Sequence, residues 1–181
     1  MYKRQILRRY IRDYGENEDI NRAVQVLERA KRDVLKAQDK TELIGYEGMA
    51  SNAYFEVLPI LILNQKTDFP FHGRNRRPPK DAVNAMLSFA YTLIANDVAA
   101  ALETVGLDPY VGFLHTLRPG RTSLALDMME ELRAYLGDRF ILSLINKRQI
   151  SVKDFLFQGD NGVVMTCLLY TSPSPRDAHE S

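Results

Sequence analysis

The 181-residue sequence has one cysteine, no tryptophan and no surplus of either charge, since 24 Lys and Arg residues stand against 23 Asp and Glu residues. The single cysteine, Cys167, excludes an internal disulfide framework and a metal site made only of cysteines. No window approaches about 18 uncharged apolar residues, and the N-terminal segment is charged, so we expect neither a membrane-spanning helix nor a secretion signal. Because 45% of the residues are hydrophobic, the chain is too apolar to be disordered. The composition predicts a globular protein of the cytoplasm.

Apolar residues recur at helical spacing through most of the chain, and capping signals mark where the helices begin and end. Asn17 or Asp19 is the expected N-cap of the second helix. We expect Pro78 and Pro79 in the first turn of a long helix, where a missing N–H costs nothing, and Gly106 just after its end. The pattern predicts helices over residues 3–12, 20–35, 41–58, 78–105 and 122–135.

The last part of the chain departs from this helical pattern. Residues 151–154 have the capping pattern of a short helix, and residues 163–166 form a short strand-like segment. Residues 167–181 contain prolines that fit neither a sheet nor a helix interior. A disordered tail is one interpretation, but the string resembles a translated sequencing adapter, and we expect a non-native tail. The predicted fold is all-α, with one helical domain over residues 1–166.

Glu47 is the first candidate for chemistry. It lies on or beside the apolar face of its helix, where a desolvated carboxylate needs a partner. Gly45 and Gly48 flank it and lower the helix propensity, which makes sense if something approaches the backbone closely. Taken alone, the segment is interpreted more simply as a boundary carboxylate that leans into solvent.

Two further candidates follow. His115 lies in a loop rich in glycine and proline, which suits a ligand or a general base, although a lone histidine is more often structural. Asp127 precedes Glu130 by three residues and Glu131 by four, so these carboxylates reach one region of a helix surface. We expect Arg133 to be too near in sequence to share their face. Taken alone, the acidic segment is interpreted as solvated surface.

Together these groups predict a site for a divalent cation. Glu47, His115 and the acidic pair offer oxygen and nitrogen ligands that suit Mn²⁺ or Mg²⁺. A metal held by three side chains keeps positions open for water and phosphate oxygens. Arg74, Arg76 and Arg77 lie in one loop and can bind phosphate in forked geometry. A basic loop is often plain surface, but beside a metal site it favours a phosphodiester substrate.

Four ordered segments resemble one known family, the CRISPR-associated spacer-acquisition integrases, which are the universal endonucleases of CRISPR adaptation. The resemblance covers about residues 1–166. The motifs that carry it are Gly45-Tyr46-Glu47-Gly48, the run from His72-Gly73-Arg74-Asn75-Arg76-Arg77-Pro78-Pro79 to Ser88-Phe89-Ala90-Tyr91, Gly112-Phe113-Leu114-His115, and Asp127-Met128-Met129-Glu130-Glu131-Leu132-Arg133.

The resemblance implies a helical catalytic domain that binds Mn²⁺ or Mg²⁺ and acts in antiviral defence. Glu47, His115 and Glu130 match the three metal ligands of the family, and Asp127 matches its additional acidic residue beside the metal. The implied activity is that of a DNA endonuclease and integrase, in which the 3′-hydroxyl of spacer DNA attacks a phosphodiester of the CRISPR repeat. The arginines of the basic loop are the candidate contacts to the DNA backbone.

The resemblance also implies partners, and it leaves alternatives. Family members act on double-stranded DNA, form homodimers and assemble with a small companion adaptation protein. The β-rich domain with which they begin has no counterpart here, and their C-terminal strand is cut near Thr166, so we expect a chain truncated at both ends. The alternatives are an inactive helical DNA-binding fragment and a plain helical bundle without a metal.

Overall fold

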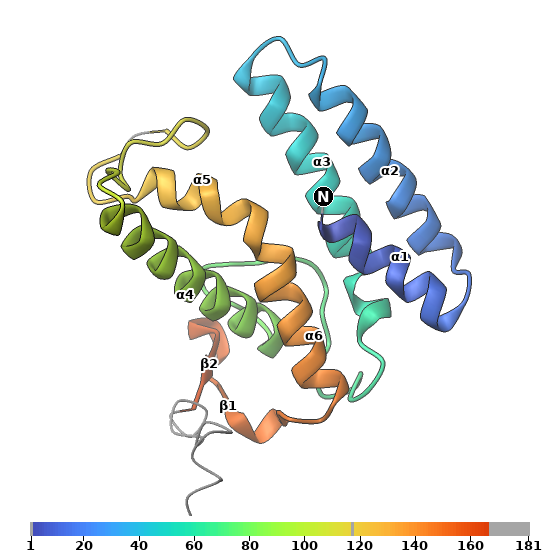
Figure 1. Cartoon of the computed structure of the whole chain (residues 1–181). Helices are drawn as coiled ribbons and strands as arrows, with labels where there is room; N and C mark the ends of the chain where they lie inside the picture. Colours follow the sequence, from blue (N-terminus) through green and yellow to red (C-terminus); the bar gives the residue numbers. More distant parts are fainter. Residues whose placement is uncertain (1, 117, 167–181) are drawn as a thin grey trace, which may run out of the picture.

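The computed structural model describes residues 2–116 and 118–166 and shows a helical body with one small hairpin (Figure 1). The predicted all-α fold is confirmed in its main feature. The predicted non-native tail, residues 167–181, lies outside the described residues. The elements are α1 (Tyr2–Tyr14), α2 (Glu18–Val34), α3 (Lys40–Leu61), α4 (Ala82–Thr104), α5 (Ser123–Leu132), a π-helical segment (Arg133–Asp138), α6 (Arg139–Asn146), β1 (Phe155–Phe157) and β2 (Val163–Met165).

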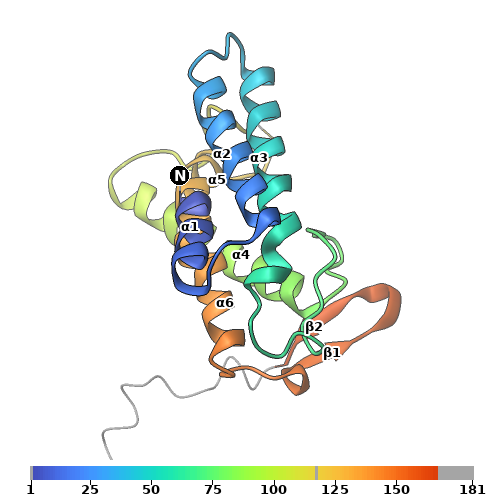
Figure 2. The same cartoon turned by 90° about the vertical axis from the view of Figure 1, so that its right-hand side faces the viewer.

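The helices form two layers (Figures 1 and 2). In the first layer α2 packs along α3, and α1 packs against α2; in the second, α4 packs against α5 and the π-helical segment. The apolar stripes of both layers meet in one core, to which Leu7, Tyr54, Leu87, Met129 and Ile145 contribute buried side chains. Burial of these stripes holds the layers together, with α1 reaching the π-helical segment of the second layer.

Side-chain caps fix where the helices begin. Asn17, one of the two predicted caps, accepts the N–H of Ile20 at 3.1 Å and starts α2. Asp81 caps α4 in the same way by accepting the N–H of Asn84 at 2.8 Å. At the other end of α4, the predicted role of Gly106 is confirmed: it has a φ of 77° just beyond the helix, where glycine is favoured.

The prediction that Pro78 and Pro79 belong to the first turn of α4 is wrong. The helix begins only after the Asp81 cap. The prolines instead pack against the hairpin: the N–H of Val163 donates to the Pro79 carbonyl oxygen at 2.8 Å, and a Cβ atom at Gly162 would lie 2.6 Å from that oxygen. These contacts with the hairpin therefore fix the position of the loop that precedes α4.

The hairpin contains one strand that the sequence predicted and one that it did not. The strand-like segment near residues 163–166 is confirmed as β2. Its antiparallel partner β1 pairs Phe155 with Met165 and Phe157 with Val163. The short helix before β1 is also confirmed, as a 3₁₀ turn in which the Ser151 N–H donates to Asp154 at 2.8 Å.

The length and composition of α4 bear on the expectation that the chain has no membrane-spanning helix. By these two measures alone it is long and apolar enough to cross a membrane. A single helix of this kind is weak evidence, because core helices of soluble proteins pass the same test. Here α4 packs against α5, the π-helical segment and β2, and it buries Asn84 in a hydrogen-bonded network. It therefore packs as a helix of a globular domain does.

Candidate functional site

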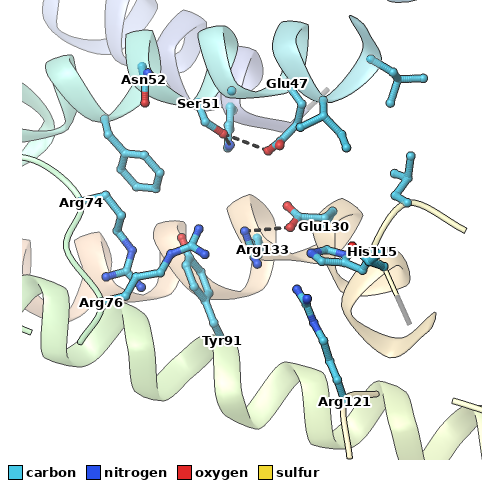
Figure 3. Close-up of a pocket in the computed structure, with 17 residues that line it drawn as sticks. Glu47, Ser51, Asn52, Arg74, Arg76, Tyr91, His115, Arg121, Glu130 and Arg133 are labelled. Atoms are coloured by element: carbon cyan, nitrogen blue, oxygen red, sulfur yellow. Dashed lines mark hydrogen bonds and ion pairs between the residues drawn. The ribbon is translucent and has the colours of Figure 1, made fainter. Parts of the chain in front are cut away.

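A pocket of about 530 Å³ opens between the two layers (Figure 3). One wall is α3; the other is made by α5 and the loop at residues 112–116, with the basic loop before α4 at one end. Side chains that the sequence singled out lie here beside others that it did not. The lining includes Lys3, Glu47, Ser51, Phe55, Arg74, Arg76, Tyr91, Leu114, His115, Arg121, Glu130 and Arg133.

Glu47 points from α3 into the pocket (Figure 3). Its carboxylate accepts a hydrogen bond from the Ser51 hydroxyl at 3.1 Å, and the Lys3 ammonium donates to the same hydroxyl at 2.6 Å. Burial lowers the pKa of Lys3, while the carboxylates around it act in the opposite direction. No atom of the described residues, beyond the helix's own backbone, would approach a Cβ at Gly45 or Gly48 within 4 Å, so the chain itself does not require glycine there.

Asp127 organises the opposite wall. Its buried carboxylate accepts three consecutive backbone N–H groups, those of Phe113, Leu114 and His115, at 2.7, 2.9 and 2.9 Å. Burial alone would raise the pKa of Asp127, but the hydrogen bonds from Leu114 and His115 outweigh it and lower that pKa. These hydrogen bonds hold residues 113–115 around the carboxylate, which stays ionised.

The contact between Asp127 and His115 also sets how the histidine faces the pocket. Their Oδ1 and Nδ1 atoms lie 2.6 Å apart. A proton on Nδ1 satisfies this bond and leaves the Nε2 lone pair for the pocket, an arrangement common among metal-binding histidines. The loop approaches so closely that a Cβ at Gly112 would lie 2.7 Å from the Ser123 carbonyl carbon and 2.8 Å from Asp127 Oδ2. Only glycine fits at that position.

Glu130 lies beside His115 in the pocket and has an unexpected partner. The Arg133 guanidinium forms an ion pair with it at 2.8 Å, so the expectation that Arg133 could not share its face is wrong. Residues three apart are neighbours on a helical surface, and Arg133 follows Glu130 by three. Burial raises the pKa of Glu130 despite Arg133, and the negative charge of Glu47 adds to the rise.

The donor set suits a divalent cation such as Mn²⁺ or Mg²⁺. Glu47, His115 and Glu130 supply two carboxylates and one ring nitrogen to the same pocket, and the two carboxylates repel each other across it. As the side chains stand, no three His, Cys, Asp or Glu groups within residues 2–116 and 118–166 lie close enough to enclose an ion. The residues fit a metal by chemistry, and the ligand assignment stays a prediction.

The three arginines of the predicted basic loop do not all lie in the pocket. Arg74 and Arg76 line the pocket, whereas Arg77 does not. The Arg74 guanidinium donates to Asn84 Oδ1 at 2.8 Å and to the Ser88 hydroxyl at 3.1 Å, and burial lowers its pKa. Neither Arg74 nor Arg76 has a carboxylate partner within the part of the chain that the structure describes.

The sequence interpretation assigned no site role to three pocket residues, namely Lys3, Tyr91 and Arg133. The spacing of three from Glu130 could have pointed to Arg133. Nothing local marks Lys3, which α1 brings to a hydroxyl 48 residues away. With it, the pocket gathers five cationic side chains against the carboxylates of Glu47 and Glu130. Such an excess of positive charge suits a polyanionic ligand.

Comparison with known proteins gives one consistent family. The family model described as "CRISPR associated protein Cas1" matches residues 2–169. A protein named CRISPR-associated endonuclease Cas1 from Leptospira interrogans is 50% identical over 142 residues, which are 78% of this chain and 56% of that protein. One from Chlorobaculum tepidum is 49% identical over 162 residues, or 88% of this chain and 47% of that protein. The chain thus spans about half the length of these curated relatives.

Solved structures agree. A CAS1 protein from Thermotoga maritima has a TM-score of 0.75 at 29% identity and covers 91% of this chain and 50% of its own. A casposase bound to integration product has a TM-score of 0.73 at 28% identity, with 91% and 45% covered. A chain of a partial Cas6-RT-Cas1–Cas2 complex has a TM-score of 0.81 at 25% identity, with 93% and 51% covered.

Proposed function

The chain belongs to the CRISPR-associated Cas1 family, and from this premise we propose that its pocket is the catalytic site of a metal-dependent DNA endonuclease and integrase. The observation that carries the proposal is the meeting of Glu47, His115 and Glu130 in one pocket that is rich in arginine. Both endonuclease relatives named above and the casposase bound to integration product support DNA as the substrate.

In this proposal the metal ligands and the arginines of the pocket have separate roles. Glu47, His115 Nε2 and Glu130 hold a Mn²⁺ or Mg²⁺ ion, with Asp127 fixing the histidine. When bound, such an ion stabilises charge on the phosphate and activates a hydroxyl nucleophile. Arg74 and Arg76 bind phosphate oxygens and orient the scissile strand, a role open to them because neither forms an ion pair with a carboxylate of the described residues.

The nucleophile decides the outcome of the reaction. Attack by a DNA 3′-hydroxyl transfers the strand, so that one phosphodiester bond breaks as another forms, and attack by water cleaves the DNA. We propose strand transfer of spacer DNA into a CRISPR array as the physiological reaction. The partners would be double-stranded DNA, a second copy of the chain and Cas2, the last supported by the neighbour in a Cas1–Cas2 complex. We place this reaction in the cytoplasm of a prokaryote.

The test is a DNA cleavage and strand-transfer assay of the 181-residue chain in Mn²⁺, with EDTA as the blank. We expect activity that is lost in Glu47→Gln and in His115→Ala, because each removes one proposed ligand. Activity that persists in both variants would overturn the metal assignment. DNA binding without any Mn²⁺-dependent activity would favour the alternative, an inactive DNA-binding chain.

A binding experiment without metal tests the DNA contacts separately. Replacing Arg74, Arg76 and Arg77 by glutamine should weaken duplex binding and flatten its dependence on salt, because each lost phosphate contact removes about one released counterion. The matched control replaces three exposed cations that do not line the pocket, Lys147, Arg148 and Lys153, by glutamine. Equal losses in both triple variants would show that the basic loop has no special part in DNA binding.

A further inference from the structure

Arg133 stands where α5 passes into the π-helical segment, and its guanidinium is tightly placed. It forms the 2.8 Å ion pair with Glu130, and its central carbon lies 4.9 Å from the centre of the Tyr91 ring. Its side chain is only 14% exposed. The Nε atom is buried and has no hydrogen-bond partner within the described residues. Arg133 is therefore paired with Glu130 by charge, while its Nε donor has no partner within the described residues.

Tyr91 forms a fixed platform under this guanidinium. Its hydroxyl donates to Asp138, which is buried at the end of the π-helical segment. A Cβ atom at Gly137 would lie 2.9 Å from the Tyr91 ring, so the close packing of ring and backbone depends on glycine. Arg74 lies 5.4 Å from the centre of the same ring. The platform thus positions two guanidinium groups at the floor of the pocket.

The partner of Glu130 matters because this carboxylate is one of the three proposed metal ligands. A guanidinium that is already bonded to a carboxylate neutralises its charge and occupies a lone pair that an incoming cation needs. Arg121 lines the same pocket but forms no ion pair within the described residues. The two arginines add the same charge to the pocket, and only Arg133 competes directly for a ligand.

We propose that Arg133 is a resident counter-cation of Glu130, held in place by Tyr91 and Asp138, which a divalent cation displaces and which then binds a phosphate oxygen of the DNA. This inference rests on the proposed metal and DNA site. In the chain without metal, Arg133 pairs with Glu130 at 2.8 Å and holds it in position. Once the cation has taken over Glu130, the guanidinium is free for the substrate, so metal binding and DNA binding favour each other.

The test measures Mn²⁺ binding to the 181-residue chain without DNA, from the free-ion signal in electron paramagnetic resonance. Arg133→Gln should bind Mn²⁺ about fivefold more tightly than the wild type, because the competing ion pair is gone. Arg133→Lys, which keeps the charge, should stay within about twofold of the wild type. The matched control Arg121→Gln, which removes the same charge from the same pocket, should also stay within about twofold.

Duplex binding with and without Mn²⁺ supplies the second readout. The duplex carries phosphorothioate linkages, which resist cleavage. Mn²⁺ should strengthen wild-type binding, and this gain should be about fivefold smaller in Arg133→Gln. Unchanged or weaker Mn²⁺ binding by Arg133→Gln, or an equal rise in Arg121→Gln, would overturn the inference and leave the proposed function standing. Failure of the wild-type chain to bind Mn²⁺ would overturn both.

Discussion

On the wall made by α5 and residues 112–116, each candidate group is held by a partner: His115 by Asp127, and Glu130 by Arg133. On the α3 wall, the one hydrogen bond to Glu47 from the described residues comes from Ser51 at 3.1 Å, one turn along the same helix. The first wall is therefore built before any ligand arrives, whereas the second can adjust its carboxylate to one. We therefore expect substitutions on the α5 wall to affect both stability and the proposed metal site, and a substitution of Glu47 on the α3 wall to affect mainly the metal site.

The largest effect on stability should come from the centre of the α5 wall. Asp127→Ala leaves three backbone N–H groups and His115 without their acceptor, and a buried unsatisfied donor costs about 1–3 kcal/mol. We expect the free energy of unfolding to fall by about 3 kcal/mol or more, measured by urea denaturation. A loss below about 1 kcal/mol would mean that the loop does not depend on Asp127.

A smaller effect should appear on acidification. Hydrogen bonds hold the pKa of Asp127 below its ordinary value of 3.8 despite burial, so its contribution to stability is present above that value and is lost as the pH falls through its folded-state pKa. The raised pKa values of Glu130 and Asp138, both due first to burial, act with the opposite sign. Asp127→Asn should therefore lose less stability than the wild type when urea denaturation is repeated in acid. Parallel losses in both proteins would assign the acid sensitivity to other groups.

The smallest effect on stability belongs to the α3 wall. Glu47→Gln keeps a side chain that can accept from Ser51, so we expect the free energy of unfolding to change by less than about 0.5 kcal/mol. Mn²⁺ binding, measured on the same protein by calorimetry, should nevertheless weaken at least about tenfold. If Glu47→Gln instead destabilised the chain as much as Asp127→Ala does, the contrast between the two walls would be lost.

Local sequence patterns determined much of the fold. The helical stripes, the Asn17 cap, Gly106 after α4 and the strand near residues 163–166 all depend on neighbours within a few positions, and the structure has them. The predicted start of α4 at the prolines is wrong because Asp81, three residues before Asn84, caps the helix, and the carbonyl of Pro79 pairs instead with Val163, which lies far along the chain. Long-range pairing of this kind leaves no periodic signal.

The sequence by itself predicted Glu47, His115, Asp127 and Glu130 as site residues, because their spacing and the family resemblance can be read from the chain alone. Only the tertiary structure decided how they are used. Packing of the two helical layers brought Lys3 to Ser51 across 48 residues and Tyr91 to Asp138 across 47. It also showed Asp127 to be a backbone anchor. A side chain's partners in a folded core are fixed by burial and shape, which no short stretch of sequence contains.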